Sequence, residues 1–272
     1  MTFLSIMLLP FLECLILVGI HSYLGLHVIR RQIIFIDLTL AQLAAMGASI
    51  AFILGYEPFQ FRTFFISFLA ALLGGIIFSL TRQKEREGVP QEGIIGLGFA
   101  ISASLSVLIL DKFAQGTEHM KDIFMGNILW VRKEEFLKAF IIYLIIGLIF
   151  TIFHKKFLLL SENIEEAKER GLNIFLWDVI FYGLFALVIT TSVEVAGVFL
   201  VFTFLITPAL MAVQTTKNFS IQLIIGWIAG TIASLLGLTF SYIFDFPSGP
   251  SVVVIYGLIL ILWSFLIKFI KK

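Results

Sequence analysis

The chain has 272 residues, of which 60% are hydrophobic and only 14% are charged, and its formal net charge is +1. Soluble globular domains are about 45–50% apolar and about 25% charged, so this composition predicts an integral membrane protein in a lipid bilayer. The near-neutral charge argues against nucleic acid as a partner, because nucleic-acid-binding domains carry basic patches. The one cysteine, Cys14, and the four histidines exclude a disulfide framework and a dense Cys or His metal cage.

Nine apolar segments are candidate membrane spans, because a helix needs roughly 20 apolar residues to cross the hydrocarbon core. The first segment has no Lys or Arg before Arg30, so we expect a retained span and not a signal peptide. The sequence therefore predicts an all-α integral membrane protein with about nine (eight to nine) spans, forming one transmembrane domain over residues 1–272. The segments lie at residues 3–26, 33–55, 63–81, 94–110, 136–153, 174–192, 195–214, 219–243 and 250–267.

The stretch from Ile174 to Val213 is almost continuously apolar and is too long for one span. We expect a tight turn near Ser192–Val195, where polar side chains interrupt the run; the alternative is one span followed by a half-helix. With two spans here and the N-terminus outside, most Lys and Arg residues fall on the inner side, as the positive-inside rule requires. The basic C-terminal sequence KFIKK then also lies inside.

Four carboxylates lie inside predicted spans, where ionisable groups are costly and commonly mark transport pathways. They are Asp37, Glu13, Glu194 and Asp178. Asp37 is the strongest candidate, because on a continuous helix it lies about 9 Å beyond Arg31 and so inside the membrane. Asp178 lies near the cytoplasmic start of its span, from where its carboxylate is expected to reach water. The alternative for each is a paired or protonated group within the helix bundle.

Polar neighbours accompany two of these carboxylates. Thr39 and Gln42 are three residues apart and share a helix face, whereas Asp37 and Gln42 differ by about 140° unless a π-bulge intervenes. Gln42 is a candidate cation contact, and an interhelical hydrogen bond explains it at least as well. Cys14 follows Glu13 directly, but adjacent residues point about 100° apart, so the two cannot easily hold one ion.

Two ligand-type residues, Glu118 and His119, stand side by side in the predicted outer loop at residues 116–131. A carboxylate and an imidazole are metal ligands, so this loop is a candidate for receiving a metal from a delivery protein. An ordinary solvated loop is the alternative.

A polar segment, SENIEEAKERGLN, connects two predicted spans on the inner side. Ser161 is a plausible N-cap, Glu165 and Glu166 fall in the first turn or so, and Gly171 stops the helix. A short capped helix over residues 161–171 favours a docking site for a soluble partner over a solvated loop.

Thr207 and Pro208 lie deep within the apolar run 197–212. Proline removes a backbone hydrogen bond and kinks a helix. The kink is either static or lines a pathway, since irregular backbone at membrane depth is tolerated where it faces a cavity.

Three blocks, in order along the chain, resemble the membrane subunits of zinc, manganese and iron ABC importers. The first, RRQIIFIDLTLAQLAAMG, resembles the family's block of two arginines, an Asp and small residues. The second is the 161–171 segment, whose Glu-Glu-Ala-Lys-x-x-Gly pattern resembles the family's ATPase-coupling segment. The third and most specific is VAGVFLVFTFLITPALMA, followed by FDFPSGPSVVV at residues 244–254.

The resemblance implies a homodimeric permease in the cytoplasmic membrane of a bacterium or archaeon. It implies a transported divalent metal (zinc, manganese or iron) and an extracellular or periplasmic metal-binding protein as a partner. It also implies a cytoplasmic ABC ATPase that docks on Glu165, Glu166, Ala167 and Gly171. This chain has no GxxxxGK[ST] motif, so we expect no cofactor in it, no enzymatic activity of its own, and ATP hydrolysis in the partner subunit. A secondary cation transporter or channel that works without an ATPase is the alternative.

One position departs from the family pattern. Many zinc and manganese members have a His four residues after the Asp, where this chain has Ala41; with one residue inserted, Gln42 takes that place. The resemblance therefore carries over Asp37 as a pathway residue and Gln42 only as its neighbour, and it leaves the identity of the metal open.

Overall fold

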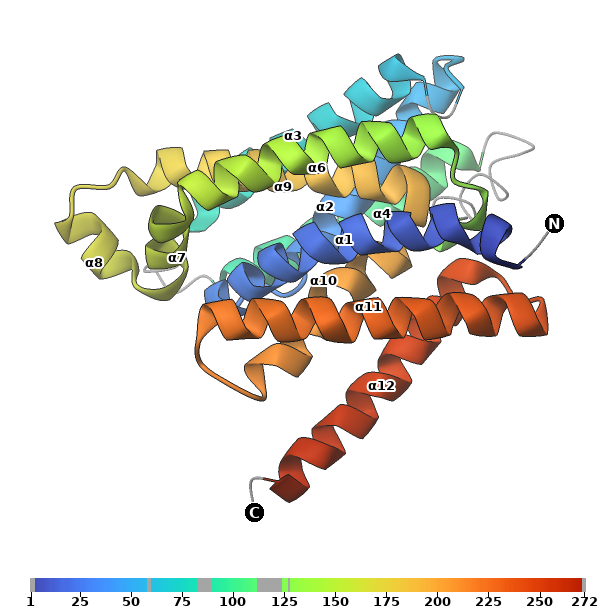
Figure 1. The fold of residues 1–272 in the computed structure, drawn as a ribbon. Helices are drawn as coiled ribbons and strands as arrows, with labels where there is room; N and C mark the ends of the chain where they lie inside the picture. Colours follow the sequence, from blue (N-terminus) through green and yellow to red (C-terminus); the bar gives the residue numbers. More distant parts are fainter. Residues whose placement is uncertain (1–2, 58–59, 83–89, 112–123, 127, 271–272) are drawn as a thin grey trace. The chain divides into compact units, whose positions relative to one another are not determined.

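The computed structural model describes residues 3–57, 60–82, 90–111, 124–126 and 128–270, and Figure 1 shows its helices along the chain. Within these residues the secondary structure is entirely helical. The elements are α1 (Phe3–Arg31), α2 (Ile36–Ile53), α3 (Phe61–Arg82), α4 (Gln91–Leu110), the 3₁₀ turn η2 (Ile128–Trp130), α6 (Lys133–Ile152), α7 (His154–Glu162), α8 (Ile164–Glu169), α9 (Ile174–Ala196), α10 (Val198–Val213), α11 (Phe219–Phe244) and α12 (Ser248–Ile270).

Eight helices in the described part of the chain are long and apolar enough to cross a membrane: α1, α2, α3, α4, α6, α9, α11 and α12. The prediction of an all-helical membrane protein with eight to nine spans is thereby confirmed. The remaining predicted segment, 195–214, forms α10, which has 16 residues. At 1.5 Å per residue it is about 24 Å long and shorter than the hydrocarbon core.

The break between α9 and α10 falls at Gly197, so its predicted place near Ser192–Val195 is wrong. Gly197 has φ 77° and ψ 162°, a conformation that residues with a Cβ rarely adopt. The helix α9 therefore continues past Ser192 and ends at Ala196.

The chain divides into two compact units. Unit 1 comprises Met1–Ile29, Phe124–Tyr143 and Val195–Lys272, and unit 2 comprises Arg30–Ile123 and Leu144–Glu194. The prediction of a single transmembrane domain stays a prediction.

Small residues bring the helices of unit 2 into close contact. Ala44 of α2, Ala71 of α3 and Ala186 of α9 form one buried cluster. At Gly47 of α2, an added Cβ would lie 2.6 Å from the Cα atom of Ser67 in α3. Such small-residue contacts are what membrane helices use, because lipid leaves little hydrophobic driving force between helices.

The ends of the unit 2 helices agree with the predicted alternation of spans. Arg31 at the end of α1 and Arg82 at the end of α3 both contact Asp178 near the start of α9. The main-chain N–H of Phe35, before α2, donates to Glu92 in the first turn of α4. Together with the short connection from α1 to α2, these contacts place the C-terminal ends of α1 and α3 and the N-terminal ends of α2, α4 and α9 on the same side.

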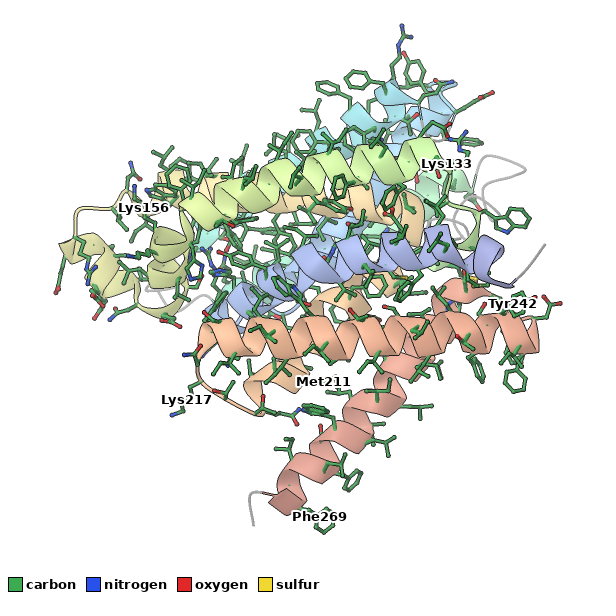
Figure 2. All side chains as sticks on the ribbon, viewed as in Figure 1. Lys133, Lys156, Met211, Lys217, Tyr242 and Phe269 are labelled. Atoms are coloured by element: carbon green, nitrogen blue, oxygen red, sulfur yellow. The ribbon has the colours of Figure 1, made fainter. Side chains whose placement is uncertain are left out.

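In unit 1, α11 packs closely on α12, where a Cβ at Gly237 would lie 2.7 Å from the Cα atom of Val252. Figure 2 marks the two ends of α11 by Lys217, just before it, and Tyr242. Toward Phe269 the apolar side chains of α12 stand away from α11 and are exposed, as expected of a surface that faces lipid (Figure 2). The indole N–H of Trp263 donates to the Met211 carbonyl at 3.0 Å and so ties α12 to α10.

Three main-chain segments of unit 1 meet at glycines, which we call the glycine junction: Gly126, Gly197 and Gly249. An added Cβ at Gly126 would overlap the Ala196 carbonyl, and one at Gly249 would overlap the Met125 carbonyl oxygen. Gly126 and Gly197 also have positive φ angles. The segment before η2, the α9–α10 break and the start of α12 thus touch through their backbones.

Candidate metal pathway and coupling segment

Asp37 lies in the first turn of α2, and its side chain is buried. Both of its carboxylate oxygens lack a hydrogen-bond partner among the residues that the structure describes. The chain turns between α1 and α2, with φ 58° at Gln32, so the expected placement of Asp37 along a continuous helix from Arg31 is wrong. A carboxylate at a helix N-terminus gains some compensation from the helix dipole, and its oxygens remain available to a cation.

Thr39 and Gln42 both face α4. The Thr39 hydroxyl lies 3.0 Å from the Ile95 carbonyl oxygen of α4 and 2.9 Å from the Phe35 carbonyl oxygen, and donates to these acceptors. The side-chain amide of Gln42 donates to the Ser106 hydroxyl at 3.4 Å, while its Oε1 atom lacks a partner within the described residues. The interhelical hydrogen bond considered for Gln42 is therefore present, and a cation contact stays a prediction.

Glu13 is buried within α1, and neither carboxylate oxygen has a hydrogen-bond partner in the part of the chain that the structure describes. The neighbouring Cys14 is also buried, close to Ser234 of α11. The Ser234 hydroxyl lies 2.8 Å from the Tyr256 hydroxyl, which donates to the Gly230 carbonyl at 2.7 Å. The thiol thus lies beside a small hydrogen-bonded group.

The other predicted ligands give no cluster. Glu194 lies in the last turn of α9 and is half-buried, whereas Glu118 and His119 fall outside the described residues. Within residues 3–57, 60–82, 90–111, 124–126 and 128–270, no group of three or more His, Cys, Asp or Glu side chains is arranged to hold a metal ion. A cation at Asp37 would therefore find at most one further His, Cys, Asp or Glu ligand in this part of the chain, and would need amides, hydroxyls, carbonyls or water for the rest.

The predicted coupling segment, residues 161–171, does not begin a helix at Ser161. That residue belongs to α7, and its hydroxyl donates to the main-chain carbonyl one turn earlier at 2.9 Å. The cap of the following helix, α8, is Asn163, whose Oδ1 accepts from the Glu166 N–H at 3.1 Å. The helix then ends before Gly171, which has φ 75°. The predicted stop at Gly171 is confirmed and the predicted N-cap is wrong.

The surface of α8 is largely charged. Glu165 is exposed, Glu166 pairs with Arg170 at 2.5 Å, and Ala167 is buried beneath them.

His154 stands at the start of α7. Its partial burial and, second, the nearby Arg30 charge hold the pKa of His154 below its usual value.

Asp178 is buried, so the expectation that its carboxylate reaches water is wrong. Its Oδ1 atom accepts from Arg31 Nη1 at 2.9 Å and from Arg82 Nη1 at 2.6 Å. Sequence reasoning missed this group because the partners lie 147 and 96 residues away along the chain. The available signal was the placement of two arginines and one carboxylate at the inner ends of their spans.

Thr207 and Pro208 are buried in α10, which continues as one helix from Val198 to Val213. The Pro208 ring packs toward two glycines of α11: an added Cβ at Gly230 would lie 3.4 Å from its Cγ, and one at Gly226 would lie 3.6 Å from its Cβ. Because Gly226 and Gly230 have no side chains, there is room for the proline ring at this contact. A role of this residue pair in the pathway stays a prediction.

Comparison with known proteins agrees with the fold. Residues 4–267 match the model of the ABC 3 transport family. The chain is 28% identical over 243 residues to the manganese transport system membrane protein MntC of Listeria monocytogenes, which covers 89% of this chain and 84% of that protein. It is 29% identical over 192 residues to a probable iron transport system membrane protein of Haemophilus influenzae, which covers 69% of each. Among solved structures, PsaBC from Streptococcus pneumoniae in complex with Fab matches with a TM-score of 0.79 and 22% identity, over 95% of this chain and 90% of that chain.

The eight long apolar helices and these matches define a multi-span permease of the cytoplasmic membrane. The chain belongs to the ABC 3 transport family. The resemblance drawn from the three sequence blocks is confirmed.

Proposed function

We propose that this chain is the permease subunit of an ABC transporter that moves a divalent metal ion across the cytoplasmic membrane, driven by ATP hydrolysis in a separate subunit. Two observations support the proposal. The family membership covers nearly the whole chain, and relatives along most of its length are named as manganese and iron transport proteins.

The observation that carries the metal-ion part of the proposal is Asp37. A dehydrated dication in a membrane needs negative charge close by, and an unpaired buried carboxylate supplies it. Gln42, five residues further along the same helix, also has a side-chain oxygen without a partner among the described residues. Glu13, Glu194, Glu118 and His119 are further candidate contacts along the pathway.

Among zinc, manganese and iron, the residue types of α2 favour Mn²⁺. Carboxylate and carbonyl oxygens suit Mn²⁺, whereas Zn²⁺ prefers imidazole and thiolate ligands. The helix offers a carboxylate, an amide and hydroxyls, and it contains neither His nor Cys.

The partners follow from the same proposal. The exposed face of α8, with Glu165, Glu166 and the turn at Gly171 over the buried Ala167, would dock a cytoplasmic ABC ATPase. A metal-binding protein outside the membrane would deliver the ion, and a second copy of the chain would complete the permease. The chain itself would hydrolyse nothing.

The experiment is metal uptake into proteoliposomes that hold this chain with or without its candidate ATPase, with Mn²⁺, Zn²⁺ and Fe²⁺ supplied separately. We expect uptake that needs both ATP and the ATPase, is greatest for Mn²⁺, and is lost in Asp37→Asn. Asp245→Asn is the matched control, because Asp245 is exposed, lies between α11 and α12, and has a left-handed conformation that Asn tolerates.

Each contrary result has a distinct meaning. Transport by this chain alone, driven by an ion gradient, would replace the proposal with a secondary transporter or channel. ATP-dependent uptake that persists in Asp37→Asn would keep the transporter class and remove Asp37 from the pathway. A loss of uptake in Asp245→Asn as well would show that the Asp37 result reflects folding.

A further inference from the structure

Three consecutive residues at the end of α7 each accept a hydrogen bond from a different arginine. The acceptors stand directly before Asn163, the cap of α8. The three bonds are Arg82 Nη2 to the Leu160 carbonyl at 2.7 Å, Arg31 Nε to the Ser161 hydroxyl at 2.9 Å, and Arg30 Nε to the Glu162 carboxylate at 2.9 Å.

Two of these arginines make a second contact deeper in unit 2. Arg31 and Arg82 both donate to the same oxygen of Asp178 in α9, and all three side chains are buried. The Arg31 guanidinium also lies 3.9 Å from the centre of the Phe181 ring, which holds its plane in place. The pair between Arg30 and Glu162 differs, because the Glu162 side chain is half exposed.

We call the buried part of this group the arginine latch: Arg31, Arg82, Asp178 and the Leu160–Ser161 acceptors. Each buried guanidinium bridges the end of α7 and Asp178, which a planar fork of several donors can do and a lysine ammonium does poorly. The latch therefore ties the end of α7 to the C-terminal ends of α1 and α3 and to the N-terminal part of α9.

The latch lies next to α8 along the chain, so movement of α8 can reach it. The helix α8 has only six residues and begins just after the latch acceptors. A displacement of α8 reaches Leu160 and Ser161 through two intervening residues, and from there it reaches three spans through buried charged hydrogen bonds. Breaking such bonds without replacement is costly, so α8, the end of α7 and the three spans move together.

We propose that the arginine latch transmits movement of the ATPase-docking helix α8 to α1, α3 and α9, which makes Asp178 a positioning residue for the coupling of ATP hydrolysis to transport. This inference rests on the proposed function, in which α8 docks the ATPase. It assigns to Asp178, Arg31 and Arg82 a role in coupling that requires no contact of these residues with the metal or with ATP.

The test measures Mn²⁺ transported per ATP hydrolysed, by the full chain reconstituted with the candidate ATPase. Asp178→Asn removes the shared charge, and Arg82→Lys keeps a charge that can reach only one of its two acceptors. Both variants should keep the ATPase bound and hydrolysing, while Mn²⁺ per ATP falls about tenfold, within the range by which coupling residues act. Glu162→Gln is the matched control in the same segment and should leave the ratio unchanged, because exposed ion pairs contribute little.

Ser161→Ala keeps the test decisive if the buried charge variants fail to fold. It removes only one hydroxyl acceptor of Arg31, and the Mn²⁺-to-ATP ratio should fall about threefold. Folded Arg82→Lys and Ser161→Ala complexes with the wild-type ratio would overturn the inference. Loss of ATPase binding together with unchanged coupling in the remaining complex would also overturn it, since the latch would then only shape the docking segment. Absence of ATPase-dependent Mn²⁺ transport by the wild-type chain would instead refute the proposed function.

Discussion

The contact between α2 and α3 gives a prediction whose size follows from the structure. In Gly47→Ala the new Cβ would lie 2.6 Å from the Ser67 Cα and 2.9 Å from the Ile66 carbonyl oxygen. Both are main-chain atoms, so no side-chain rotation relieves the overlap, and the two helices must separate by several tenths of an ångström. Overpacking of this kind costs about 1–3 kcal/mol, and alanine returns about 1 kcal/mol of helix propensity. The expected net loss of stability is up to about 2 kcal/mol.

Gly96→Ala in α4 is the matched control. An added Cβ there meets nothing within 4 Å in the described part of the chain, so only the gain in helix propensity remains. We expect this variant to be more stable than the wild type by up to about 1 kcal/mol. The free energy of unfolding would be measured in mixed detergent micelles by titration with SDS, with helix content followed by circular dichroism. Equal stabilities of the two variants, or a greater loss in Gly96→Ala, would refute the argument that main-chain contact sets the α2–α3 distance.

Two further predictions concern the segment around α7 and α8, which the charge distribution predicts to lie on the inner side. An NMR titration should give a pKa for His154 below its ordinary value of about 6.5, and Arg30→Gln should raise it, because partial burial and then the Arg30 charge disfavour the imidazolium. Because the folded-state pKa is the lower one, the unfolded chain takes up the proton first as the pH falls. The stability that neutral His154 contributes is therefore present above the unfolded-state pKa and is lost below it. A His154 pKa that does not change in Arg30→Gln would contradict the assigned effect of the Arg30 charge. Asn163→Ala removes the acceptor of the Glu166 N–H and should destabilise α8 by about 1 kcal/mol, seen as faster amide exchange confined to that helix, whereas Asn163→Asp should keep the cap. Unchanged exchange in Asn163→Ala would show that the cap does not hold α8.

The spans were predictable because lipid imposes a simple rule on composition and length. Each of the nine apolar segments became a helix, since main-chain polar groups at membrane depth have to be satisfied within the segment. The turn at Gln32 was not predictable, because no glycine or proline marks it. The break at Gly197 carried a weak signal, a glycine in an apolar run, but its cause is the close approach of Gly126, which is remote in sequence.

The residues of the candidate site also fall into a group that the sequence predicted and a group that it did not. Asp37 and Glu13 were identified from the sequence, because a carboxylate in an apolar helix is conspicuous by itself. The wrong predictions concern residues whose role depends on distant partners. Ser161 accepts a hydrogen bond from Arg31, and the cap of α8 is Asn163 instead. Asp178 was expected to reach water because it lies near the start of its span, where a side chain can extend to the membrane surface. Only the folded chain brings two arginines to it.

The glycine junction has a consequence for how this chain tolerates mutation. Every single-nucleotide change in a glycine codon that alters the residue introduces an atom at the Cβ position or ends the chain. Such an atom overlaps neighbouring main chain at Gly126, Gly197 and Gly249 alike. No single-nucleotide change to another amino acid at these positions therefore preserves the junction, although none of them carries a side chain that could touch a metal. In a screen that scores only metal uptake they will look like transport residues, and measuring the amount of folded protein in the membrane separates the two.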